Sequence, residues 1–363
     1  MLRAIFLSLI LSFVQLCFAE EVDNLYISLV PVADQTATSK RQGSIDAFKN
    51  VLIKLTGNSE IVTLAPIKAL LENSTSFIDA LSYEELPANL SLPELSSSSE
   101  IGLRVSFSRS AIDEMIREIK LPVLPSNRPK LIIWIVKDDV ESGREFLGES
   151  SVKANENSIG ARVLNDLKSI MMDRGIPFML PTYDLEDQLA LSIEAAWNLD
   201  AEKISVASKK YDADGWIAIR FYKSSAGEVR GAWLFKAGDV QETRDFNTKS
   251  NDSFLVSIMD SMIDNLVTPF SYIPQQESNM LFVEIRGISS IVDYQRVSKQ
   301  LLKLELVNSI DLFSVRGDEI QLSVASEGDA GLLHRALIRS GQFRARNTIE
   351  VKEKSLSFNW VSK

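Results

Sequence analysis

The stretch RPKLIIWIV, Arg128 to Val136, decides how the central part of the chain folds. Its last six residues, Leu131 to Val136, are all apolar and show no alternation with polar residues. Such a run is typical of a strand that is covered on both faces of its sheet, because a solvated face would carry polar side chains at every second position. The preceding LPVLPSNRP, Leu121 to Pro129, contains three prolines, which cannot continue a helix. We therefore expect a linker and then the first strand of a layered α/β unit.

Helical and strand patterns alternate after this strand. The expected elements are a helix from Ile159 to Ile170, a short strand at Phe178–Leu180, a helix from Leu185 to Ala196, a helix capped by Asp200, a hairpin of Trp216–Tyr222 and Val229–Lys236, and an amphipathic helix from Phe254 to Leu266. Strands separated by helices predict one mixed sheet with a parallel pair and an antiparallel hairpin.

Two further units flank this middle one. The N-terminal unit has the expected order βαββα, with its first helix closed by Gly57. The last unit has the expected order βαββαβ, from a strand at Leu281–Ile285 to a final strand around Leu356–Trp360, and this order is typical of a ferredoxin-like unit. The predicted fold class is α/β (α+β) in three small units, with boundaries at residues 20–124, 125–272 and 273–363.

The first nineteen residues have the pattern of a secretory signal peptide. Arg3 precedes an apolar run from Ala4 to Cys17, and cleavage is expected after Ala19. The run is shorter than the roughly 20 residues that span a bilayer. We expect a periplasmic protein without a transmembrane segment in its mature form; an uncleaved anchor, lipidation at Cys17 and peripheral membrane association remain alternatives.

Composition excludes several classes of site. Cys17 is the chain's one cysteine, so after cleavage no thiol nucleophile, disulfide or cysteine-based zinc site is available. Arg3 is the only charged residue of the predicted signal, so its loss changes the net charge from −10 to −11. An acidic chain lacks the basic face that nucleic acid requires, and we predict no nucleic-acid partner.

The motifs of common enzymes are absent from the sequence. His334 is the single histidine and falls in an expected helix, with no G-x-S-x-G elbow elsewhere. There is no G-x-x-x-x-G-K-[ST] phosphate loop and no G-x-G-x-x-G motif. We therefore predict no cofactor and favour a protein without enzymatic activity.

Four carboxylates form the only candidate metal site. Asp138 and Asp139 follow the first strand of the middle unit, and Asp184 and Asp187 follow its short strand. Ligands bind beyond the carboxyl ends of strands in open α/β sheets, so these groups could converge on Mg²⁺ or Ca²⁺. The simpler interpretation is that Asp184 caps a helix whose first turn carries Asp187.

Arginines and tryptophans are the remaining candidates for binding a partner. Arg335, Arg339, Arg344 and Arg346 cluster at and after the last helix, where they could contact an acidic partner or simply form a solvated helix face. Trp197, Trp216 and Trp233 fall in or beside expected elements and are predicted to pack mainly in the core.

Four ordered motifs resemble a known family. They are LVPVADQTATSKRQGSIDAFKNVLIKLTGN (Leu29 to Asn58), RPKLIIWIV (Arg128 to Val136), RGIPFMLPTYDLED (Arg174 to Asp187) and ASKKYDADGWIAIRF (Ala207 to Phe221). Together they resemble domain of unknown function 2066, a family of gammaproteobacterial envelope proteins with no established reaction. The middle unit is also similar, at the level of fold, to the TolB amino-terminal and CsgG-like α/β domains, which are interaction modules. The resemblance implies an envelope location.

The sequence thus predicts an exported interaction or scaffolding protein of the cell envelope, with envelope proteins as partners. A metal-binding protein or metal-assisted hydrolase that uses the four carboxylates is the first alternative. A module that binds a small ligand in the cleft between the first two units is the second.

Overall fold

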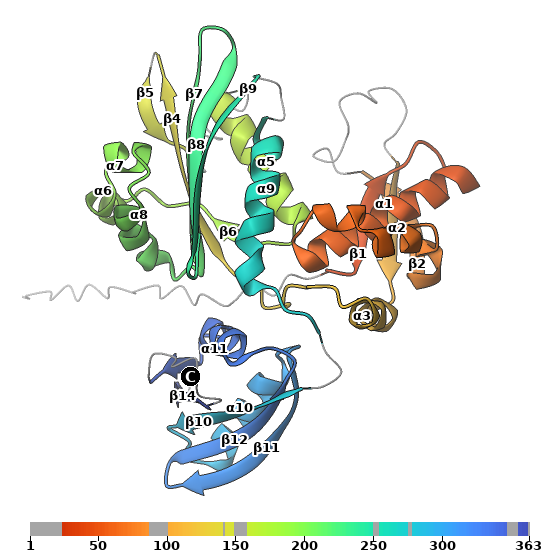
Figure 1. The fold of residues 1–363 in the computed structure, drawn as a ribbon, viewed down its shortest axis with the longest axis vertical. Coiled ribbons are helices and arrows are strands. Elements are labelled where there is room, and N and C mark those ends of the chain that lie inside the picture. The colour runs from red at the N-terminus through yellow and green to blue at the C-terminus, as the bar shows by residue number, and fades with distance from the viewer. Residues whose placement is uncertain are drawn as a thin grey trace, which may run out of the picture.

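The computed structural model describes residues 24–86, 101–140, 142–148, 158–249, 254–274, 278–346 and 355–361. The fold is mixed α/β, with three sheets of parallel and antiparallel strands and helices packed on them. Figure 1 shows the N-terminal and middle units side by side and the C-terminal unit below them. The predicted fold class is therefore confirmed. The expected signal peptide and its cleavage point after Ala19 lie outside the described residues.

The N-terminal unit is a three-stranded antiparallel sheet with the order β1-β3-β2, and helices cover one face. Thr36 caps the first helix by accepting from the Ser39 N–H, and Gly57 ends it in the left-handed region, at φ 71°. Its elements are β1 (Ile27–Pro31), α1 (Ala37–Thr56), α2 (Ala65–Leu71), β2 (Ile78–Glu85), β3 (Ile101–Phe107), α3 (Arg109–Glu118), and 3-10 helices at Glu60–Thr63 and Ser74–Phe77.

The middle unit contains a sheet with the order β5-β4-β7-β8-β9, in which β6 also pairs with β4. Strand β4 pairs in parallel with β7, and β7 and β8 form the expected antiparallel hairpin. The elements are β4 (Leu131–Asp139), β5 (Gly143–Phe146), α5 (Ile159–Asp173), β6 (Phe178–Met179), α6 (Leu185–Ala190), α7 (Ile193–Trp197), α8 (Ala201–Ser208), β7 (Gly215–Lys223), β8 (Glu228–Ala237), β9 (Val240–Lys249) and α9 (Phe254–Val267).

Strand β4 is buried on both faces, as its apolar run predicts. Leu131, Ile133 and Ile135 point toward the helices α5 and α9, and the alternate residues Ile132 and Trp134 point toward α6, α7 and α8. Figure 1 shows these two helix layers on opposite sides of the sheet. The sheet is therefore the middle layer of a three-layer sandwich.

Three elements of the middle unit differ from the expectation. Strands β5 and β9 were not predicted, and the single helix expected from Leu185 to Ala196 is divided into α6 and α7. Ser192 separates the two helices, because its side chain accepts from the Ala195 N–H and starts a new helix there. Most residues of β9 are exposed, so its sequence lacks the apolar alternation that marks a half-buried strand.

The C-terminal unit has a sheet with the order β11-β12-β10-β14-β13, covered by two helices on one face. The predicted βαββα order is present. The single last strand is replaced by two, however, and β14 runs parallel to β10 and lies between β10 and β13. The unit thus keeps the predicted pairing of a last strand with the first, and β13 is an additional strand at the edge of the sheet. The elements are β10 (Asn279–Arg286), α10 (Ile291–Leu302), β11 (Val307–Arg316), β12 (Glu319–Ser326), α11 (Ala330–Arg339), β13 (Phe343–Ala345) and β14 (Ser355–Trp360).

Candidate functional site

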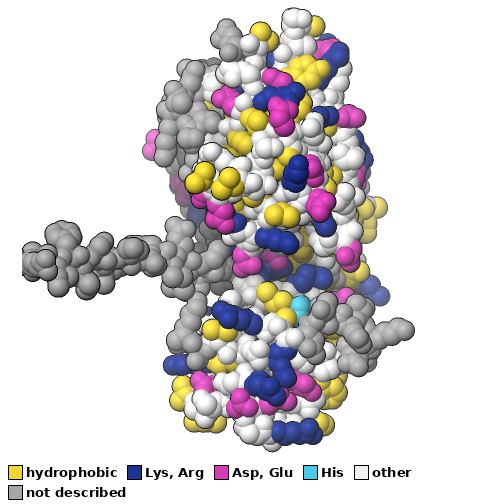
Figure 2. Space-filling model, turned by 90° about the vertical axis from the view of Figure 1, so that its left-hand side faces the viewer, with side chains coloured by type: hydrophobic (Ala, Val, Ile, Leu, Met, Phe, Trp, Pro, Cys, Tyr) yellow, Lys and Arg dark blue, Asp and Glu magenta, His cyan; other side chains and the backbone are white. Residues whose placement is uncertain are grey.

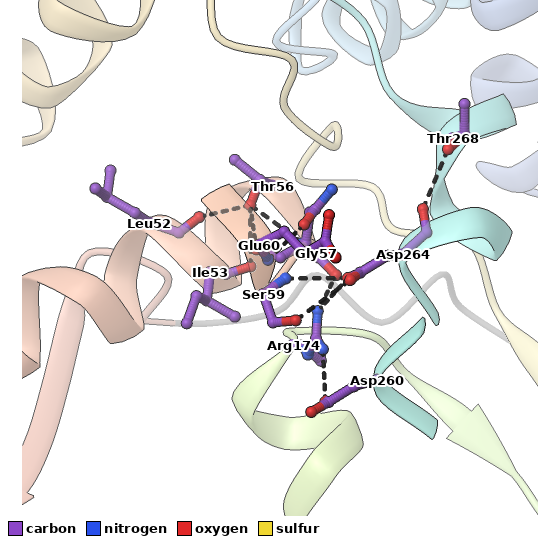
Figure 3. A network of polar contacts seen from close by, with 11 residues as sticks. Leu52, Ile53, Thr56, Gly57, Ser59, Glu60, Arg174, Asp260, Asp264 and Thr268 are labelled. Carbon is purple, nitrogen blue, oxygen red and sulfur yellow. Dashed lines mark hydrogen bonds and ion pairs between the residues drawn. The ribbon is translucent and has the colours of Figure 1, made fainter. Parts of the chain in front are cut away.

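A buried arginine joins the N-terminal and middle units. The side chain of Arg174, at the end of α5, is 4% exposed and lies between two helices of other segments (Figure 3). It donates to Asp264 Oδ1 at 2.6 Å and to Asp260 Oδ1 at 2.7 Å, both on α9. It also donates to the carbonyl of Gly57, which follows α1, at 2.9 Å. One side chain thus connects three helix segments from two units.

Asp264 completes this network from the other side. Its carboxylate accepts the Ser59 N–H at 3.0 Å and the Ser59 hydroxyl at 3.3 Å, as well as the Arg174 guanidinium (Figure 3). Charge-assisted bonds of this kind are about twice as strong as neutral ones. Arg174 also lies beyond the C-terminal ends of α1 and α5, where a positive charge complements both helix dipoles. We call this network, formed by Arg174, Asp260, Asp264, Gly57 and Ser59, the Arg174 junction.

Gly175 explains the second position of the RGIPFMLPTYDLED motif, Arg174 to Asp187. Its φ of 61° lies in the left-handed region, and a Cβ there would come within 3.1 Å of the Lys54 carbonyl oxygen. The backbone after α5 thus passes close to α1, and only glycine fits without strain. The RGIPFMLPTYDLED motif therefore begins with a packing joint between two units.

A crevice opens beside the Arg174 junction. Its volume is about 290 Å³, and residues of the N-terminal unit, of the linker and of α9 line it, among them Thr56, Leu64, Pro122, Asp264 and Val267. The crevice thus lies between the first two units, which is the position predicted from the sequence for a small-ligand site.

Other arginines bind the C-terminal unit to the rest of the molecule. Arg339 of α11, whose side chain is 7% exposed, donates to Asp214 Oδ2 at 3.0 Å and also to the carbonyl of Asn127 in the linker. Arg109 of α3 pairs with Glu305 at 2.5 Å. These contacts join the C-terminal unit to both of the other units.

Arg128, in the RPKLIIWIV motif, is buried in the linker. Its side chain is among the largest fully buried ones and donates to the Leu55 carbonyl at 3.3 Å. Burial lowers the pKa of Arg128 to about 10. The residue is therefore a positive charge packed against the end of α1, and it adds to the link between the first two units.

The four predicted metal ligands lie in two separate ion-pair clusters. Asp138 accepts from Arg144 Nε at 3.2 Å, and Asp139 is 3.8 Å from Lys137 Nζ. Asp184 and Asp187 both contact Lys210 Nζ, at 2.5 and 3.2 Å. The expected convergence on one cation is not observed: within the described ranges, no group of three or more acidic, histidine or cysteine side chains is arranged to hold a metal ion.

Asp184 and Asp187 instead stabilise the start of α6. Asp184 accepts the Asp187 N–H at 3.0 Å, which is the capping role that the sequence also suggested. The hydrogen bond from Lys210 lowers the pKa of Asp184. Asp187 is 2% exposed and accepts the Tyr211 hydroxyl at 2.5 Å. The lysine thus occupies the position beside both carboxylates that the metal hypothesis gave to a cation.

The four predicted partner-binding arginines separate into two groups. Arg335 and Arg339 face the middle unit, since Arg335 donates to the Pro269 carbonyl at 3.1 Å and Arg339 pairs with Asp214. Arg346 pairs with Glu319 at 2.8 Å within its own unit, and Arg344 is exposed on β13. On the face drawn in Figure 2, basic and acidic side chains are interspersed and form no large patch of one sign.

His334 takes no part in a catalytic arrangement among the described residues. Its ring lies 5.2 Å from that of Phe358, and burial, together with the neighbouring Arg335, lowers its pKa. Trp216 and Trp233 are 4% and 2% exposed, as expected for core residues. Trp197 is partly buried, with the guanidinium of Arg144 4.6 Å from its ring centre.

The surface that sequence reasoning missed is the C-terminal sheet. Its helix-free face carries Phe282, which is partly buried, and the exposed Met280 and Phe313, at 48% and 64% exposed. Phe282 and Phe313 are in edge-to-face contact, with ring centres 5.2 Å apart. We call Met280, Phe282 and Phe313 the aromatic patch. The alternation in β10 indicated its buried residues, but nothing in the sequence showed that no described helix would cover the other face.

Comparisons with known proteins identify one domain. Residues 19–125 match the family model described as Domain of unknown function (DUF8605). This match covers the N-terminal unit and less than a third of the chain. It agrees with the expectation of a domain of unknown function, whereas the narrower assignment to domain of unknown function 2066 stays a prediction.

The other comparisons add no functional argument. No curated protein matches the chain. A solved structure, "Crystal structure of protein VC0702 from Vibrio cholerae", aligns with 38% of this chain and 66% of that chain, slightly less than two thirds of that protein, at 9% identity and a TM-score of 0.18. A TM-score this low supports no conclusion on fold. No described helix has the length and apolar character to cross a bilayer.

Proposed function

We propose that this protein is a non-enzymatic interaction protein of the cell envelope that binds a protein partner through the aromatic patch of its C-terminal sheet. The location rests on the signal-like first nineteen residues and on the resemblance of four motifs to domain of unknown function 2066. The interaction role is supported by the similarity, at the level of fold, of the middle unit to the TolB amino-terminal and CsgG-like domains, which are interaction modules.

The observation that carries the proposal is the exposed aromatic patch. Sheets usually bury their apolar face, yet Met280 and Phe313 are 48% and 64% exposed beside Phe282. Exposed apolar groups that lie together and are rimmed by polar residues mark interaction sites more often than scattered ones do. Asp311, Ser314 and Arg316 of β11 supply a polar rim on the same side.

The rest of the molecule is suited to hold this patch in place. The Arg174 junction fixes the N-terminal unit to the middle unit, and Arg339 fixes the C-terminal unit to both of its neighbours. Because these charges are satisfied within the chain, they are not available for catalysis or for a partner. A rigid body that presents one exposed apolar surface is the arrangement expected of a scaffold.

Partner capture from cross-linked envelopes tests the proposal. Met280→Ser with Phe313→Ser should abolish recovery of a specific protein that the wild type retrieves. The matched control is Leu185→Ser with Leu189→Ser, which removes two apolar side chains that are 70% and 79% exposed on α6. Equal recovery by both double variants would exclude the aromatic patch as the binding surface.

A small-ligand role in the crevice beside the Arg174 junction is the second candidate. The crevice, at about 290 Å³, is near the lower size of pockets that hold drug-sized ligands, and it has both apolar and polar lining residues. Thermal-shift screening of envelope metabolites tests it, since a ligand that binds only the folded state raises the melting temperature. Substitution of Leu64, which lines the crevice, should remove such a shift.

A further inference from the structure

Strand β11 is one of the two edge strands of the C-terminal sheet, and β13 is the other. Strand β11 pairs with β12 on one side, and within the described residues no strand pairs with its other side. Figure 1 shows the β11–β12 hairpin at the end of the molecule that lies away from the other two units. Backbone N–H and C=O groups along such an edge can accept another strand.

The side chains of β11 point to the two sides of the sheet in an order that is the same from either end of the strand, and we call this order the palindrome. Ile310, Leu312 and Val315 stand opposite the core residues Val324, Leu322 and Ile320 of β12, and therefore point to the helix-covered side. Asp311, Ser314 and Arg316 stand opposite Ser323, Gln321 and Glu319, on the open side. Phe313, in the irregularity between Leu312 and Ser314, contacts Phe282 and so also points to the open side.

This pattern is symmetric about the point between Phe313 and Ser314. On moving outward from that point in either direction, the side chains point first to the open side, then to the helix side, then to the open side again. A β-bulge usually disrupts pairing at an edge. Here the irregularity lies at the centre of the palindrome, so two antiparallel copies of β11 would have matching side-chain directions.

The charges of β11 have the same symmetry. Asp311 and Arg316 lie at equal distances from the centre and on the same side, and both are exposed. Neither side chain forms an ion pair or a side-chain hydrogen bond among the described residues. In a symmetric antiparallel strand pair, opposite charges at equal distances from the axis lie across from each other and can form ion pairs.

We propose that two copies of this chain associate through their β11 strands, which pair antiparallel around a two-fold axis between Phe313 and Ser314. In this register Asp311 of each copy lies opposite Arg316 of the other, and Leu312 lies opposite Val315. Directly opposed residues have Cβ atoms about 5 Å apart, so both ion pairs and both apolar pairs form. The two sheets join into one continuous sheet of ten strands.

Other registers are less favourable. If the pairing shifts by one residue, residues that lie across from each other have side chains on opposite sides of the sheet. A shift of two residues places Leu312 opposite Phe313 or Ser314 opposite Val315, which point to different sides, and it separates Asp311 from Arg316. The palindrome and the charges therefore select the same register independently.

Apolar side chains of β11 that point to the helix-covered side of the sheet are also exposed. Leu312 and Val315 are 47% and 57% exposed, and Leu302 of α10 is 52% exposed. A groove lined by residues of α10 and by Ile310 runs next to this strand. Pairing of β11 would bring the same apolar row of the second copy beside this groove, and would bury side chains that are exposed in one copy.

This inference goes beyond the proposed function. The pairing concerns the strand edge, whereas the proposed partner binds the aromatic patch on the open face. A joined sheet would present two aromatic patches beside one axis. The dimer is measured on the purified protein alone, so its failure and the failure of partner capture are separate results.

Charge reversal tests the pairing. Asp311→Arg alone places arginine opposite arginine at two positions, and Arg316→Asp alone places aspartate opposite aspartate. Each single variant should weaken the dimer about tenfold or more, as measured by sedimentation equilibrium of the full chain. The double variant restores both ion pairs with their signs exchanged, and should dimerise within about threefold of the wild type. A monomeric wild type at high micromolar concentration, or a double variant no better than the single ones, would overturn the proposal.

Cysteine cross-linking tests the register. In a Cys17→Ser background the chain has no other cysteine. Leu312→Cys with Val315→Cys should yield a disulfide-linked dimer, because positions 312 and 315 of one strand are roughly 10 Å apart, too far to bridge within a copy. Asp311→Cys with Ser314→Cys is the control, since these positions are not opposed in the proposed register. Preferential cross-linking of the control pair would contradict the proposed axis.

Discussion

The Arg174 junction and the β11 edge differ in whether their charged side chains have partners within the chain. At the junction, a guanidinium that is 4% exposed has partners on three helix segments, and each partner belongs to the same chain. On β11, Asp311 and Arg316 are exposed, and their side chains form no ion pair or side-chain hydrogen bond among the described residues. The chain thus satisfies its own charges at the junction, whereas two charged side chains on β11 extend from the edge of a sheet into solvent.

The largest effect is expected at the Arg174 junction. Arg174→Met leaves Asp264, whose side chain is 12% exposed, without its main counter-charge. Breaking one partner of a buried pair typically costs about 3 to 5 kcal/mol, so the free energy of unfolding should fall by about 3 kcal/mol. Urea denaturation measures this change. Arg244→Met, which breaks an exposed pair with Glu242, is the control and should cost less than about 1 kcal/mol. Equal losses of unfolding free energy in the two variants would show that the junction stabilises the fold no more than an exposed ion pair does.

A smaller effect is expected where the C-terminal unit meets the others. Arg339→Ala removes the contacts to Asp214 and to the linker carbonyl of Asn127, and should cost about 2 kcal/mol. The connection between α9 and β10 should also become more sensitive to protease. Arg344→Ala removes an exposed arginine of the same predicted cluster and should change neither quantity. If the Arg344 variant behaved like the Arg339 variant, the cluster would act as one surface and not as an internal contact.

The ion-pair clusters of the predicted metal ligands give the third prediction. Lys210→Met should destabilise the protein by about 1 kcal/mol, because Asp187 is 2% exposed and loses a charged donor. Millimolar Mg²⁺ or Ca²⁺ should leave the melting temperature of the wild type unchanged, since Lys210 already occupies the position beside Asp184 and Asp187. A clear rise in melting temperature with either ion, and its loss in Asp184→Asn, would restore the metal-site hypothesis.

The smallest effect concerns pH. Burial lowers the pKa of His334 in the folded protein below its unfolded value of about 6.5. The unfolded chain therefore binds more protons between the two pKa values, and stability should decrease as pH falls from about 6.5 through the folded pKa. Because His334 is the only histidine, His334→Gln should flatten this part of the stability profile. A variant that keeps the wild-type slope would assign the pH dependence to another group.

Most of the fold could be predicted from the sequence, because its patterns are local. The apolar run of β4 indicated a strand covered on both faces, and Gly57 marked the end of α1. Strand β9 could not be predicted from the same rules, since its side chains are mostly exposed and its conformation depends on pairing with β8.

The candidate site was harder to predict for a related reason. Asp184 as a helix cap is a local property and was identified correctly. The role of Arg174 depends on Asp264, ninety positions further along the chain, and no spacing rule connects the two. The palindrome of β11 likewise depends on its register with β12 and on the irregularity at Phe313. Sequence patterns show which residues are apolar or charged, but not which of them remain without a partner.

Photo-cross-linking in the native envelope tests the central claim most directly. A photoreactive side chain at position 313, in the aromatic patch, is compared with one at position 189, an exposed site on α6. The account predicts specific adducts from position 313, to a partner protein or to a second copy, and none from position 189. Adducts from position 189 alone, or equal adducts from both positions, would contradict the claim that the C-terminal sheet is the interaction surface.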